Sequence, residues 1–88
     1  MSDLPETFRL RFIDRCRGDL AELEAGPDDA ALRRLIHGLA GAAGTFGFPR
    51  ISEMAGVIDD DLTEGREPDP ARLDALRAAL RDLVRPGR

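Results

Sequence analysis

The residue of this sequence best suited to carry out chemistry is His37, the only histidine in the chain. Histidine titrates near neutral pH, so a neutral ring nitrogen is available as a nucleophile. With residues 32–46 placed on a helix at about 100° per residue, His37 falls opposite the middle of a broad apolar arc. That arc contains Leu32, Leu35, Ile36, Leu39, Ala42, Ala43 and Phe46. The pattern therefore predicts an imidazole that faces solvent.

The residues beside the histidine on this predicted face are basic or small. Arg33 and Arg34 precede it by one turn, and Ala40, Gly41 and Gly44 follow it. A glycine inside a helix costs roughly 1 kcal/mol relative to alanine, and packing cannot require it on an exposed face. We therefore expect the two glycines to let another surface approach. A helix-packing seam of small residues is the alternative explanation.

The histidine also opens a motif. The chain reads His37-Gly38-Leu39-Ala40-Gly41, and the run GAAGTFGF continues it from residue 41 to residue 48. The motif resembles the signature of histidine phosphotransfer (HPt) domains, in which His-x-Leu-Lys-Gly is followed by a glycine near the helix end. Gly47 matches that last glycine. The run is especially similar to the phosphotransfer domain of chemotaxis histidine kinases, and the similarity extends from about residue 32 to residue 62.

The resemblance implies a function and partners. His37 would take a phosphoryl group on Nε2 and exchange it with the aspartate of a response-regulator receiver domain. A histidine kinase or hybrid kinase would be a further partner. The receiver would supply Mg²⁺, and this chain would need no cofactor. Ala40, Gly41 and Gly44 would form the docking face for the receiver. The chain would then be a phosphoryl carrier without turnover of its own, and not an enzyme.

Three positions depart from the family pattern. The family has lysine where this chain has Ala40, so Arg33 and Arg34 are candidates to supply charge to the phosphate. Two solvated arginines are the alternative interpretation. Chemotaxis domains have, at the position of Asp59, a glutamate that hydrogen-bonds the histidine ring. If the shorter aspartate reaches Nδ1–H, it orients the ring and leaves Nε2 free. Gly56 replaces a further histidine of that family.

Two other functions remain open from the sequence. A module of the same fold could bind a receiver domain, or another helical partner, without moving phosphate. The change from lysine to Ala40 and from glutamate to Asp59 motivates this alternative. A third possibility is a phosphotransfer domain of a kinase, which would receive its phosphate from ATP directly. The chain contains no Gly-Lys-Ser/Thr phosphate-binding loop, so such a kinase would lie elsewhere.

The composition predicts one small helical domain. The chain has 88 residues, no Trp or Tyr and four Phe, so leucine, alanine and isoleucine must supply most of the core. The formal net charge is −4, which argues against nucleic acid as a partner. All basic residues are arginine. The N-terminus has no apolar signal segment, and no apolar run approaches the ~20 residues of a membrane span. We therefore expect a cytoplasmic protein without a membrane partner.

Neither the cysteine nor the aspartates predict a metal site. Cys16 is the only cysteine, so it cannot form an intramolecular disulfide, and we interpret it as a small buried apolar residue. One histidine and one cysteine do not make the usual zinc site. Asp59, Asp60 and Asp61 are consecutive, and consecutive helical side chains point about 100° apart. They are therefore not expected to converge on one ion.

Four amphipathic segments predict helices at about 3–25, 28–46, 49–64 and 69–85. We expect Asp3 to cap the first helix in a capping box with Glu6, and Pro5 to lie in its first turn. Asp28 and Asp69 are predicted caps of later helices. Short connections favour an all-α, antiparallel up-down-up-down four-helix bundle, one HPt-like domain over residues 1–88. We expect a monomer, with a helix-paired dimer as the alternative.

Overall fold

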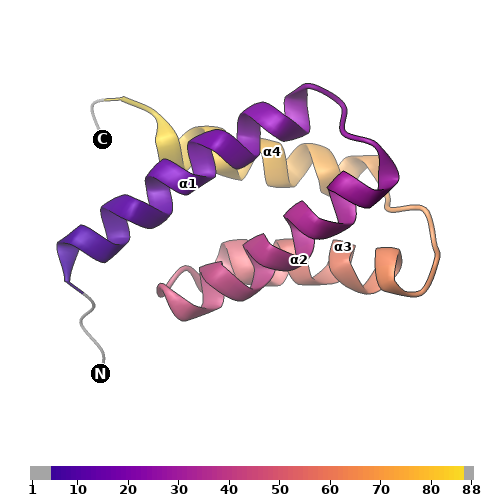
Figure 1. Cartoon of the computed structure of the whole chain (residues 1–88), viewed down its shortest axis with the longest axis horizontal. Helices are drawn as coiled ribbons and strands as arrows, with labels where there is room; N and C mark the ends of the chain where they lie inside the picture. The colour runs from indigo at the N-terminus through magenta and orange to yellow at the C-terminus, as the bar shows by residue number, and fades with distance from the viewer. Residues whose placement is uncertain (1–4, 87–88) are drawn as a thin grey trace.

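Four helices, each antiparallel to the one before it, make up the described part of the chain, residues 5–86, in a computed structural model (Figure 1). They are α1 (Glu6–Glu24), α2 (Asp29–Thr45), α3 (Pro49–Thr63) and α4 (Pro70–Val84). Helix α2 packs against α1 and α3, and α4 packs against α1 and α3. The predicted all-α, up-down-up-down bundle is confirmed. No helix within residues 5–86 is long and apolar enough to cross a membrane.

Two helices begin at the aspartates that the sequence singled out. The Asp28 carboxylate accepts a hydrogen bond from the backbone N–H of Ala31 at 2.8 Å, and the Asp69 carboxylate accepts one from Ala71 at 2.9 Å. Each bond satisfies a backbone donor that has no partner within its own helix. Pro49 is the first residue of α3. Proline is favoured at this position because a residue in the first helical turn needs no backbone N–H for an intrahelical hydrogen bond.

The start of α1 differs from the prediction. Pro5 has extended backbone angles (φ −55°, ψ 147°) and occupies the N-cap position, and the helix begins at Glu6. Pro5 therefore precedes the first turn and does not lie in it. The predicted partner of Glu6 in a capping box, Asp3, lies outside the described residues. At the C-terminal end of each helix, the residue predicted to be the last helical one occupies the C-cap position. These are residues 25, 46, 64 and 85.

A tight turn joins α2 to α3. Gly47 has a φ of +83°, a conformation that glycine adopts without strain. Its backbone N–H donates to the carbonyl of Gly44, and the N–H of Phe48 donates to the carbonyl of Ala43 at 2.8 Å. This pair of bonds is a Schellman motif, which ends a helix and reverses the chain. As a result, α3 returns directly along α2, the helix that carries His37.

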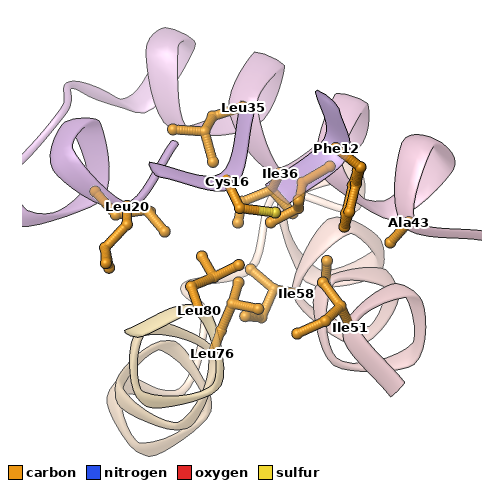
Figure 2. Packing of buried hydrophobic residues seen from close by; sticks show 13 residues of the cluster. Phe12, Cys16, Leu20, Leu35, Ile36, Ala43, Ile51, Ile58, Leu76 and Leu80 are labelled. Carbon is orange, nitrogen blue, oxygen red and sulfur yellow. The ribbon is translucent and has the colours of Figure 1, made fainter. Parts of the chain in front are cut away.

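The core lies between the four helices and draws on all of them. Figure 2 shows side chains from different helices pointing toward one another around Cys16 and Ile36. Within the described residues, thirteen apolar residues are buried: Phe12, Cys16, Leu20, Leu23, Leu35, Ile36, Leu39, Ala43, Ile51, Ala55, Ile58, Leu76 and Leu80. Burial raises the pKa of the Cys16 thiol to about 12, with the nearby Asp19 as a second cause. The thiol is therefore neutral, and Cys16 packs as the small apolar residue predicted from the sequence.

Two apolar residues at helical spacing on α1, Phe8 and Ile13, are not among the buried core residues. Phe8 is 40% exposed. It lies in the first turn of α1, where the ring of Phe46 covers it edge-on, with ring centroids 6.3 Å apart. Phe12, one turn further along α1, is stacked on Phe46 and packs closely on Phe48. Helical spacing alone cannot distinguish these two phenylalanines, because only the inner one has neighbours on all sides.

Candidate functional site

The site is centred on the exposed face of α2. The His37 side chain is 81% exposed, although the preceding residue, Ile36, is completely buried. This contrast follows from helix geometry, because neighbouring side chains point about 100° apart. Packing of Ile36 and Leu39 against the core sets the rotation of α2. The imidazole is therefore held toward solvent by residues that never touch it.

Asp59 of α3 contacts the histidine ring. The distance from His37 Nδ1 to Asp59 Oδ2 is 3.1 Å, and the Asp59 side chain is 22% exposed. An ionised carboxylate only accepts hydrogen bonds, so the ring nitrogen facing it carries the proton. In the neutral ring, Nε2 then keeps its lone pair. The other two aspartates of the run at residues 59–61 do not share this contact with the ring. Asp60 is exposed, and Asp61 pairs with Arg66, with 2.9 Å between Oδ1 and Nη2.

The arginines named from the sequence also lie beside the ring. A surface depression of about 280 Å³ is lined by Arg33, Arg34, His37, Asp59, Leu62 and Thr63. Among residues 5–86, neither Arg33 nor Arg34 forms an ion pair or a side-chain hydrogen bond. Their guanidinium groups are therefore available to a ligand. Arginine is suited to phosphate because its planar group donates two parallel hydrogen bonds.

The small residues after the histidine do not all have the same role. A Cβ added at Gly41 would meet no atom outside its own helix within 4 Å, so this glycine leaves open space next to the ring. A Cβ added at Gly44 would lie 3.3 Å from Oγ of Ser52 in α3. Gly44 is exposed, as expected, but a side chain there would require Ser52 to shift by a few tenths of an ångström. Ala40 is half-buried, and its carbonyl accepts a hydrogen bond from Ser52 Oγ at 2.9 Å.

The opposite edge of the face is formed by a residue that the sequence did not single out. Arg15 of α1 lies across α2 at Gly38, where an added Cβ would be 2.7 Å from Nη2 of Arg15. Asp19 holds the guanidinium, with 3.3 Å between its Oδ2 and Nε of Arg15. Burial raises the pKa of Asp19, and the charge of Arg15 opposes this shift. Helical spacing places Arg15 and Asp19 one turn apart, but it cannot show that Arg15 lies against α2.

The arrangement suits one kind of chemistry. An exposed nucleophilic nitrogen, a carboxylate on the other ring nitrogen and two unpaired arginines could accept and hold an anionic group such as a phosphoryl group. Within residues 5–86, no group of three or more His, Cys, Asp or Glu side chains is placed to hold a metal ion. The site therefore has the parts of a group carrier.

Comparison with known proteins gives one result. The family model described as the Hpt domain matches residues 8–85, a range that begins in the first turn of α1 and ends just after α4. No curated protein and no solved structure matches the chain. The match spans nearly the whole sequence and includes the histidine, both arginines and the aspartate of the site. The chain therefore belongs to the Hpt domain family.

Proposed function

We propose that this protein carries a phosphoryl group on His37 and exchanges it with the aspartate of a response-regulator receiver domain. Membership of the Hpt family supports a histidine phosphotransfer role in a phosphorelay. Hpt domains are phosphocarrier modules rather than enzymes, and they interact with kinases and receiver domains. The observation that carries the proposal is the exposed imidazole with its Nδ1 atom 3.1 Å from Asp59. The proposed phosphorelay would operate in the cytoplasm.

The transfer step can be written from these atoms. The lone pair of His37 Nε2 attacks the phosphorus of an aspartyl phosphate on the receiver, and an Nε2–P bond forms. The P–O bond to the receiver aspartate breaks, and its electron pair leaves with that carboxylate. The ring gains positive charge, which the Asp59 carboxylate offsets through the Nδ1–H hydrogen bond. The reverse step uses the same atoms, so phosphate can move either way.

Two further features support the proposal. Arg33 and Arg34 border the same depression as His37, and they would pair with the phosphoryl oxygens as these arrive. Ala40, Gly41 and Gly44 follow the histidine along α2 and carry no long side chain. A receiver domain docking over this part of α2 would bring its phosphorylated aspartate to Nε2 without displacing bulky groups. The Mg²⁺ ion of the reaction would belong to the receiver.

The experiment mixes this protein with receiver domains from the same genome, each charged with acetyl phosphate. Phosphate on the protein is followed over seconds to minutes, with His37→Ala and His37→Gln alongside. We expect one receiver to label the wild-type protein rapidly and neither variant to be labelled. Circular dichroism checks that the variants keep their helices, as an exposed residue should allow. Labelling of the His37→Ala variant would refute the proposal.

A second candidate function is receiver binding without phosphoryl transfer. The observation that favours it is Ala40, which stands where the HPt signature has lysine and supplies no charge to a phosphate. The same experiment separates the two functions. A receiver that binds this protein but leaves it unlabelled would support the binding module. An acid-labile, base-stable phosphate on His37 would exclude it.

A further inference from the structure

Ser52 of α3 forms a hydrogen bond to α2 close to His37. The Ser52 hydroxyl donates a hydrogen bond to the backbone carbonyl of Ala40, with 2.9 Å between the two oxygens. Ala40 lies within one turn of His37 along α2. Ser52 and Asp59 are about two turns apart on α3, so they lie on the same face of that helix. The serine and the aspartate therefore contact α2 from one row of α3, on the same side as the histidine.

Gly44 leaves the space in which the serine lies. A Cβ at this position would be 3.3 Å from Ser52 Oγ and 3.9 Å from Ser52 Cβ. The first distance is shorter than ordinary van der Waals contact, so an alanine would require the serine to shift by a few tenths of an ångström. A glycine inside a helix costs roughly 1 kcal/mol relative to alanine. The close approach of α3 gives that cost a structural reason.

The spacing between α2 and α3 decides whether an aspartate can reach the ring. Aspartate is one methylene shorter than glutamate, yet its carboxylate lies 3.1 Å from His37 Nδ1. A shorter side chain needs a nearer backbone, or a rotamer that points more directly at the ring, to reach the same partner. The hydrogen bond from Ser52 to the Ala40 carbonyl is one contact that brings the two backbones together beside the histidine.

We propose that Ser52 is a positioning residue for His37. It holds α3 close enough to α2 for Asp59, rather than a glutamate, to hydrogen-bond Nδ1 and so keep the lone pair on Nε2. The consequence for phosphoryl transfer rests on the proposed function, but the positioning itself does not. It can be measured on the protein alone, without a receiver or a phosphate.

The test reads the tautomer of His37 from its ring-nitrogen chemical shifts by NMR, at an alkaline pH at which those shifts no longer change with pH. The variants are Ser52→Ala, Asp59→Glu and the double variant. We expect Ser52→Ala to lower the ratio of Nδ1–H to Nε2–H by roughly three- to tenfold, as when one hydrogen bond is weakened. Asp59→Glu should lower the ratio in the wild-type background, where the side chain is too long. It should restore the ratio in the Ser52→Ala background.

A matched pair of glycine variants gives an independent reading. Gly44→Ala places a methyl group against Ser52 and should shift the tautomer in the same direction as Ser52→Ala. Gly56→Ala is the control, because a Cβ at Gly56 on α3 meets no atom outside its own helix within 4 Å. It should leave the ratio unchanged. Thermal unfolding of each variant accompanies the NMR measurement, so that a loss of stability is seen separately.

The outcomes are distinct. A reversed effect of Asp59→Glu between the two backgrounds would establish that Ser52 sets the reach of the aspartate. An unchanged tautomer ratio in Ser52→Ala, with only a lower melting temperature, would overturn the inference and leave Ser52 a purely structural contact. The same effect of Asp59→Glu in both backgrounds would also overturn it. Neither result depends on labelling by a receiver, so failure of the proposed function would be recognised separately.

Discussion

The carboxylate of Asp59 lies 3.1 Å from Nδ1 of His37 and is 22% exposed, whereas the histidine that it contacts is 81% exposed. The acceptor is thus sheltered between α2 and α3, and the nucleophile projects from the surface. A sheltered carboxylate is less screened by water than an exposed one. The pairing can therefore orient the ring while leaving Nε2 open to a partner.

Removing the charge at Asp59 should slow phosphoryl transfer. Asp59→Asn keeps the size of the side chain but replaces a charge-assisted hydrogen bond by a neutral one, which is roughly half as strong. We expect the rate of labelling by a charged receiver to fall roughly tenfold, or about 1.4 kcal/mol in the barrier. Asp60→Asn is the matched control, since Asp60 is the exposed neighbour on α3. Equal rates for the two variants would show that Asp59 does not assist transfer.

Neutralising both arginines should weaken the handling of phosphate. In the double variant Arg33→Gln, Arg34→Gln, we expect labelling to slow by roughly two- to thirtyfold, because each of the two exposed ion pairs with phosphate contributes about 0.2–1 kcal/mol. The difference from wild type should shrink as salt is added. The control is the double variant Arg72→Gln, Arg77→Gln on α4, a helix that does not contact α2. If both double variants slow equally, only the net charge of the protein matters.

Supplying the lysine of the family signature should increase transfer. Ala40 is half-buried, so the stem of a lysine in Ala40→Lys would lie along the surface and its ammonium group would reach solvent near His37. We expect faster labelling, by roughly two- to fivefold, from the added charge. Ala40→Gln, a long side chain without charge, separates electrostatics from steric effects. Slower labelling in both variants would instead indicate that docking needs a small residue at this position.

The buried thiol should make stability depend on alkaline pH. The pKa of Cys16 is raised from 9.0 to about 12 by burial, so the unfolded chain loses this proton first. The stability that the neutral, buried thiol contributes is fully present below pH 9.0 and is lost as the pH rises toward 12. The free energy of unfolding should then fall by about 1.4 kcal/mol per pH unit over that range. Urea titrations at several pH values measure this slope.

The composition of the chain allows a slope in this pH range to be attributed to Cys16. All basic side chains are arginine and the chain has no Tyr, so no other side chain has an ordinary pKa between 9 and 12. Cys16→Ala should remove the slope at a cost of about 1 kcal/mol for the small cavity. A slope that persists in the Cys16→Ala variant would show that the thiol is not its source.

The features that follow from short stretches of chain could be predicted from the sequence. Apolar spacing predicted the helices and the solvent-facing position of His37. Asp28, Asp69 and Gly47 were recognisable as helix ends, because a cap or a left-handed glycine acts within a few residues. Such interactions depend on backbone geometry that is the same in every helix. The family motif also lies within one helix and the turn after it.

Only the tertiary structure decided which residues meet across helices. The contact of Asp59 with His37, the bond from Ser52 to Ala40 and the position of Arg15 over Gly38 depend on the separation and rotation of whole helices. Many side chains in all four helices set these quantities together, so no single stretch of sequence contains them. For the same reason, the sequence did not show that the exposed Gly44 lies beside Ser52. A sequence shows which face a residue occupies, and packing decides what lies opposite that face.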